Sequence, residues 1–316
     1  MGAETKIEWC HHSWNPVIGC TKVDAGCTHC YAETETFPRV QRSRGRELWG
    51  PRGERHRTSP AYWKQPIKWD RDAAAAGERR RVFCASMSDV FEDHPVWNGG
   101  VRAEVLGLID ETPHLDWLLL TKRPAHAAEI LSAEISDETV PHPRRNLWLG
   151  TSVSDQESAD KRVPELLRAP AVIRFLSVEP LLGQVDLRNI AMPNGDLWDV
   201  LRGELIAHES GCVADDETPR IDWVIVGGES GPHARPCDVA WIRDIVLQCK
   251  NANVPCFVKQ MGSVSRVHDV FDLSDSAFET FDAHGNMPHF PATVRLLDKG
   301  GDLPEDLRVR EFPVTA

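Results

Sequence analysis

Short apolar runs recur along the chain at intervals that suit alternating strands and helices. Between most of them lie amphipathic segments with helical periodicity, as in residues 158–169 and 238–253. Strands that alternate with such helices are typical of βαβ units, and nearly continuous apolar strands indicate a parallel sheet buried on both faces. The predicted strands are residues 81–89, 115–124, 146–155, 171–181, 221–231 and 254–262.

A first strand that leads into a cysteine-rich loop would complete this series of β/α units. The predicted fold class is therefore α/β, a parallel (β/α) barrel of TIM type, closed or partial. In this prediction residues 1–262 form the barrel, with an excursion at about 188–220 that fits the repeat poorly. Residues 263–316 are predicted to be a C-terminal extension packed on the barrel.

The composition is typical of a globular cytoplasmic protein. Hydrophobic residues make up 41% of the 316 residues and charged residues 27%, and the apolar runs are far shorter than the roughly 20 residues that span a bilayer. The first residues show no signal-peptide pattern, so we expect neither secretion nor membrane association. In that setting the nine cysteines are expected to be reduced thiols.

One segment departs from the acidic balance of the chain. The net charge is −12, yet residues 39–71 carry ten Lys or Arg residues against three acids, together with four aromatic residues. Basic residues interleaved with aromatics suit phosphate contact and base stacking. The alternative is a solvated basic loop whose tryptophans pack on the barrel. The candidate nucleic-acid-binding residues are Arg42, Arg44, Arg46, Arg52, Arg55, Trp49 and Trp63.

Polar residues follow the apolar runs abruptly. In parallel barrels the chemistry gathers at the carboxyl ends of the strands. The sequences "FLSVEP" and "VIVGGES" place a carboxylate at that rim, and the two glycines of the second would let a ligand approach the backbone. The candidate rim residues include Ser86, Ser88, Asp89, Lys122, Ser152, Glu179, Gly227, Gly228, Glu229, Lys259 and Gln260.

Three cysteines crowd the loop after the predicted first strand. Cys20, Cys27 and Cys30 have the spacing Cys-x6-Cys-x2-Cys, and thiolates this close in a glycine-containing loop suit one metal centre. A structural zinc site closes with four protein ligands, and Cys10 with His11 and His12 lies just upstream. Three ligands on a four-iron cluster would instead leave one iron open for a small molecule.

Several blocks of the sequence resemble the phage-associated three-cysteine-motif family, whose members are similar to radical S-adenosylmethionine (SAM) enzymes. The similarity runs from about residue 6 to 313, although the family usually has threonine at the position of Cys10. The matching blocks are "WNPVIGCTKVDAGCTHCYAE", "ASMSDVF", "LLTKRP", "LGTSVSDQESADKRVPEL", "RFLSVEPLLG", "DWVIVGGESGPHARP" and "FVKQMG".

The resemblance implies a partial barrel as in radical SAM enzymes, with a [4Fe–4S] cluster on Cys20, Cys27 and Cys30 and with SAM on the open iron. One electron from the cluster would cleave SAM to methionine and a 5′-deoxyadenosyl radical that takes a hydrogen atom from the substrate. The implied SAM contacts are Ser86, Ser88 and Asp89 for the amino group, Ser152 and Glu179 for the ribose or carboxylate, and Gly227 and Gly228 for the adenosyl moiety.

The substrate is predicted from the remaining rim residues and from the phage association. Cationic and amide donors suit an anionic substrate, and with the basic segment they favour a nucleotide or a nucleic-acid base. A peptide or a small metabolite is the alternative. An electron-donor protein and a partner protein encoded nearby are further expectations. The residues left for the substrate are Lys122, Arg174, Glu229, Arg235, Lys259 and Gln260.

Two other kinds of function compete with this one. In the first, zinc or an inert cluster braces the N-terminal loop of a non-catalytic nucleic-acid-binding module. In the second, the barrel carries a metal-dependent hydrolase, which would need His and carboxylate ligands at the strand ends. The polar residues at many strand ends favour an enzyme over a brace, because a brace needs only its own loop.

Overall fold

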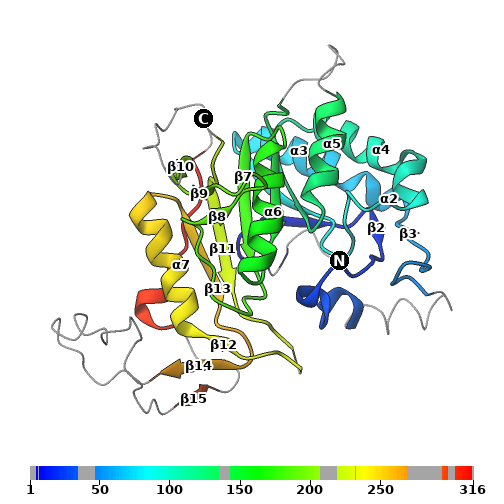
Figure 1. The fold of residues 1–316 in the computed structure, drawn as a ribbon. Helices are drawn as coiled ribbons and strands as arrows, with labels where there is room; N and C mark the ends of the chain where they lie inside the picture. Colours follow the sequence, from blue (N-terminus) through cyan, green and yellow to red (C-terminus); the bar gives the residue numbers. More distant parts are fainter. Residues whose placement is uncertain are drawn as a thin grey trace, which may run out of the picture.

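The fold is built around a seven-stranded parallel sheet that curls into a half-barrel (Figure 1). A computed structural model describes residues 5, 7–34, 47–134, 143–206, 219–231, 233–268, 294–297 and 303–314. The strand order is β1-β4-β5-β6-β7-β11-β13, so β1 and β13 are the two edges. These strands are His12–Trp14, Arg80–Cys84, Leu115–Thr121, Leu147–Ser152, Ile173–Val178, Trp223–Gly227 and Cys256–Gln260.

Each predicted apolar run therefore contains one strand, and the prediction of an α/β fold with a parallel sheet is confirmed. The first strand, β1, leads into the cysteine loop as expected. The open edges make the sheet compatible with a partial barrel. The strands are apolar nearly throughout because both of their faces are covered.

Helices connect the strands and cover the convex face of the sheet (Figure 1). Their limits follow local signals: Asp155 begins α6 with a capping box, and Asn253 ends α7 in the left-handed conformation. Two of these helices, α6 and α7, fall within the predicted amphipathic segments 158–169 and 238–253 or within two residues of them. The helices are α2 (Pro60–Trp63), α3 (Gln65–Ala76), α4 (Arg102–Asp110), α5 (Pro124–Ala133), α6 (Gln156–Arg168) and α7 (Val239–Ala252).

Large aromatic side chains fill the concave side of the half-barrel below the strand ends. Trp9, Phe83, Trp148, Phe175, Trp223 and Phe257 are buried there in one cluster. Gly150 of β6 makes room for this cluster, because a Cβ atom on it would lie 2.5 Å from the ring of Phe175. The interior is therefore packed at its amino-terminal end and leaves space only above this layer.

We expect Gly150→Ala to lower the free energy of unfolding by about 1–3 kcal/mol, because the added methyl group forces the ring of Phe175 to move. Gly107→Ala is the matched control. A Cβ at Gly107 of α4 would meet no atom within 4 Å, and alanine favours a helix by about 0.5–1 kcal/mol over glycine. Urea unfolding should thus give opposite signs for the two variants, and equal effects would contradict the packing account.

The predicted excursion begins as a small antiparallel sheet of β8 (Ile190–Ala191), β9 (Leu197–Asp199) and β10 (Glu204–Ile206). Another small sheet contains β12 (Cys237–Asp238), β14 (Ser265–His268) and β15 (Val294–Leu297), and β2 (Val17–Ile18) pairs with β3 (His56–Arg57). No helix among the described residues is long and apolar enough to cross a membrane.

Residues 303–314 cover the β13 edge of the sheet. Val258 N donates to Val309 O over 3.0 Å, and Glu311 N donates to Cys256 O over 2.9 Å. Phe312 packs against the aromatic cluster, and the Arg81 guanidinium lies 3.9 Å from the centre of its ring. This part of the chain therefore protects a strand edge and closes the amino-terminal end of the half-barrel.

Candidate functional site

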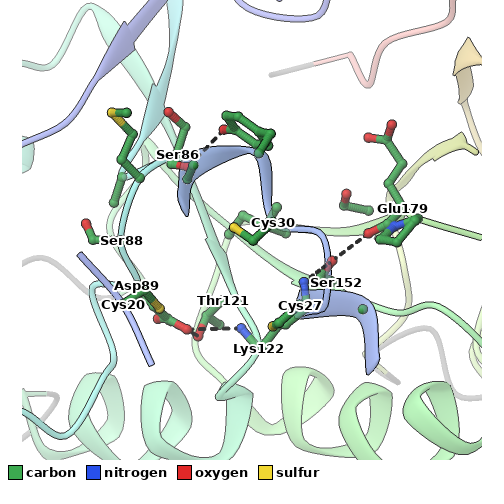
Figure 2. Close-up of a pocket in the computed structure, with 18 of the residues that line it drawn as sticks. Cys20, Cys27, Cys30, Ser86, Ser88, Asp89, Thr121, Lys122, Ser152 and Glu179 are labelled. Carbon is green, nitrogen blue, oxygen red and sulfur yellow. Dashed lines mark hydrogen bonds between the residues drawn. The ribbon is translucent and has the colours of Figure 1, made fainter. Parts of the chain in front are cut away.

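A cavity of about 610 Å³ opens at the carboxyl ends of the strands, beneath the cysteine loop. The loop supplies Cys20, Cys27 and Cys30 to its wall, and Figure 2 shows the three thiol side chains around it with the labelled strand-end residues. The structure thus brings the three cysteines together with most of the predicted rim. The predicted residues that line the cavity are Ser86, Ser88, Asp89, Lys122, Ser152, Glu179, Gly228, Glu229, Lys259, Gln260 and Trp49.

The cysteine loop contains a short 3₁₀ turn, Ala25–Cys27, and all three thiols are free of disulfides. Burial, with Asp89 and Glu92 nearby, raises the pKa of Cys20 to about 12, so metal binding there would release a proton. In the described part of the chain no group of three or more His, Cys, Asp or Glu side chains is placed so that it could hold a metal ion as it stands. The fit to a metal therefore rests on three soft donors that line one cavity.

A chain of polar contacts crosses the cavity wall from β5 to β13. Lys122 Nζ donates to Ser152 Oγ over 3.0 Å, and Ser152 Oγ donates to the carbonyl oxygen of Glu179, also over 3.0 Å (Figure 2). Lys259 Nζ lies 3.1 Å from Glu179 Oε1. Four strand ends thus present cations, a carboxylate and a hydroxyl above an apolar floor that includes Trp9, an arrangement that suits a polar ligand with an apolar part.

The carboxylate of Asp89 is hydrogen-bonded to other groups of the protein. It is buried and accepts hydrogen bonds from Thr121 Oγ1 and Arg123 Nη1, each 2.8 Å long, and from Phe91 N over 3.0 Å. Ser86 Oγ and Ser88 Oγ likewise donate to Asn15 Oδ1 and Val17 O. Asp89 thus links the loop after β4 to the end of β5, and its predicted contact with a ligand stays a prediction.

Glu229 and Arg235, both predicted to contact substrate, bind each other at the rim. Arg235 Nε and Nη2 donate to the two carboxylate oxygens over 2.9 and 2.6 Å, and His29 Nδ1 lies 3.2 Å from Glu229 Oε2. Although burial opposes it, hydrogen bonding from Arg235 and His29 lowers the pKa of Glu229 to about 2. Glu229 is therefore ionised at any physiological pH and has no role as a general acid in this arrangement.

The two glycines at the carboxyl end of β11, Gly227 and Gly228, lie close against the protein's own atoms. A Cβ at Gly228 would lie 2.2 Å from Met261 O, and one at Gly227 would lie 2.9 Å from Glu179 Oε1. The close approach that requires glycine at these positions is thus between neighbouring strand ends. Their predicted contact with an adenosyl moiety stays a prediction.

The positions of Arg174 and Arg55 show that their predicted roles at the site were wrong. Arg174 is the second residue of β7, so it lies at the opposite end of the strand from the cavity, where Nη2 donates to Ala169 O. Arg55 is buried, and its guanidinium donates to both carboxylate oxygens of Glu92 over 2.8 and 2.7 Å. Neither arginine can reach the ligand that the sequence suggested for it.

The aromatic residues of the basic segment pack inward. Trp63 makes an edge contact with Trp14, with ring centres 5.1 Å apart, and Trp69 stacks on His12 at 4.3 Å. Trp49 is buried beside the cysteine loop. Of the predicted arginines, Arg52 is exposed, whereas Arg42, Arg44 and Arg46 lie outside the described residues. Packing of the tryptophans on the barrel, the alternative reading of this segment, describes the structure better.

Sequence reasoning missed Glu92 and Arg162 among the charged residues that hold the cysteine loop, and it placed Arg123 at a strand end without a role at the loop. Arg123 Nη2 donates to Thr21 O over 2.8 Å, and Thr21 N donates to Glu92 Oε1 over 2.9 Å. Arg123 directly follows Lys122 in "LLTKRP", and a usable signal was also present for Glu92, which lies three residues after Asp89 in "SDVFE". Arg162 lies within a helix and carries no such signal.

A family model described as "Protein of unknown function (DUF5131)" matches residues 4–290. No curated protein and no solved structure matches the chain. The matched range includes the cysteine loop and every strand end that lines the cavity.

Proposed function

The chain belongs to the DUF5131 family, and we propose that it is a radical SAM-like iron–sulfur enzyme that modifies or repairs a nucleotide or a nucleic-acid base. In this proposal the half-barrel is a partial barrel of TIM type, as in radical SAM enzymes. Cys20, Cys27 and Cys30 would hold a [4Fe–4S] cluster, which when bound supplies the electron for cleavage of SAM. The phage-associated three-cysteine-motif family is the resemblance behind this proposal.

One observation carries the proposal. The three closely spaced cysteines line the same cavity as the polar ends of β5, β6, β7 and β13, so a metal on the loop would face a ligand-sized space. A volume of about 610 Å³ is within the usual range for one organic ligand or cofactor. A structural clasp would need neither the cavity nor the polar residues around it.

Residues of the cavity wall have defined tasks in this proposal. Ser152 and Glu179 would contact the ribose or the methionine carboxylate of SAM. Lys122, Lys259 and Gln260 would orient the substrate, and the apolar floor below them would exclude water from the reaction. The nucleotide part rests on these donors and on the arginine-rich sequence before Glu47, since the tryptophans of the basic segment are packed inside.

Anaerobic reconstitution tests the proposal. The purified chain should bind roughly four irons and as many sulfides, and the EPR spectrum of the reduced protein should change when SAM is added. The product mixture should contain 5′-deoxyadenosine. Stoichiometric zinc, or a cluster whose EPR spectrum does not change when SAM is added, would instead support a non-catalytic metal-stabilised nucleic-acid-binding module. An electron-donor protein and a partner protein encoded nearby are part of the same proposal and can be added to the assay.

A further inference from the structure

Four arginines contact the cysteine loop, residues 20–30, from four separate parts of the chain. Arg55 precedes β3, Arg123 follows β5, Arg162 lies in α6, and Arg235 precedes β12. Each arginine is at least 34 residues away in the sequence from the loop residue that it contacts. The loop is therefore held by tertiary contacts rather than by its own short turn.

The first half of the loop is held at Thr21, next to Cys20. Arg55 Nη2 donates to Thr21 Oγ1 over 2.7 Å, and Arg123 Nη2 donates to Thr21 O over 2.8 Å. Arg123 Nη1 also lies 4.0 Å from Cys20 Sγ. Two guanidinium groups thus fix the backbone and the side chain of the residue beside the first thiol.

The second half of the loop is held at Asp24 and Ala25, just before Cys27. Arg162 forms an ion pair with Asp24, and its Nη1 donates to Ser152 O over 2.7 Å, which ties the loop to the end of β6. Arg235 Nη1 donates to Ala25 O over 2.8 Å. A Cβ at Gly26 would lie 2.5 Å from Ser154 Oγ, so the loop also packs tightly against this rim.

Each of these arginines has its own carboxylate. Arg55 pairs with Glu92, Arg123 with Asp89, Arg162 with Asp24, and Arg235 with Glu229. The four pairs add little net charge beside the thiols, so their effect is geometric. A carboxylate that binds one edge of a guanidinium fixes the direction of its remaining N–H groups. In Arg55, Arg123 and Arg235 one of these N–H groups donates to an oxygen of the loop.

We infer that these four arginines preset the cysteine loop for its metal, and that Arg235 is the positioning residue for the half that carries Cys27 and Cys30. The loop starts from β1, at one edge of the sheet, whereas Arg235 follows β11, the neighbour of the other edge strand. The Arg235–Ala25 contact therefore spans the open side of the half-barrel. This inference rests on the proposed role of the three cysteines as metal ligands.

Titration of the full chain with Co²⁺ under reducing, anaerobic conditions tests the inference without SAM or turnover. The thiolate-to-cobalt charge-transfer band reports ligation by cysteine. Arg235→Gln should weaken Co²⁺ binding by about 10–100-fold, the usual effect of removing a group that orients a metal ligand. Glu229→Gln should act in the same direction, because it removes the carboxylate that aims Arg235. Both variants should keep the wild-type circular dichroism spectrum.

Arg243→Gln is the matched control, because Arg243 of α7 forms an arginine–carboxylate pair of 2.6 Å with Asp306, away from the loop. It should leave Co²⁺ binding unchanged. Wild-type affinity in both Arg235→Gln and Glu229→Gln would overturn the inference, and so would a wild-type chain that shows no thiolate band. If the cobalt result holds but the reconstituted chain ignores SAM, the positioning role stands and the proposed enzyme fails.

Discussion

Cys27→Ala should abolish cluster assembly and, with it, cleavage of SAM. A [4Fe–4S] cluster on three thiolates has no spare protein ligand, and Cys27 closes the 3₁₀ turn of the loop with its side chain on the cavity wall. Iron per chain after reconstitution should fall from roughly four to near zero, and no 5′-deoxyadenosine should form. Iron and sulfide analysis with a product assay measures both.

Cys10→Ala is the control for this variant. Cys10 is buried in the aromatic cluster at the other end of the half-barrel, and burial raises the pKa of its thiol to about 12. Its removal should leave iron content and SAM cleavage at wild-type values. If Cys27→Ala retained iron, or if Cys10→Ala lost it, the ligand assignment would be wrong.

The positions of the strands could be predicted because their apolar runs are continuous and end abruptly. For the same reason the rim could be predicted: Ser152, Glu179 and Lys259 stand at or next to the last residue of a strand. Arg174 shows where this reading was too loose. It lies five residues before Glu179, or roughly 16 Å along an extended strand, and that spacing alone could have excluded it from the rim.

The roles of the arginines could not be predicted in the same way. Arg55 belongs to a run of basic residues that looks like a nucleic-acid contact, and its burial depends on Glu92, which is 37 residues away. Periodicity describes a single element, whereas an ion pair between two loops depends on how the elements pack. The same limit applies to Glu229 and Arg235, which share one short segment but are fixed by a loop about 200 residues earlier.

Glu92→Gln should lower the free energy of unfolding by about 3–5 kcal/mol, because it leaves the guanidinium of Arg55 buried and unpaired. The side chains of Arg55 and Glu92 are only 0% and 3% exposed. The new amide would also turn a donor toward the N–H groups of Arg55. Since Glu92 accepts from Thr21 N, the variant should in addition loosen the loop at Cys20 and reduce iron uptake.

Urea unfolding measures this loss, and Glu104→Gln controls for it. Glu104 pairs with Arg57 on the surface, with side chains 50% and 45% exposed, so its loss should cost about 0–1 kcal/mol. Although burial opposes it, hydrogen bonds from Arg55 and Thr21 lower the pKa of Glu92 below 4.5. The stability from its ionised form is therefore complete above pH 4.5 and is lost as the pH falls through the lowered value. The difference between wild type and Glu92→Gln should shrink over that acid range, and a difference that stayed constant would show that the buried charge pair is not its source.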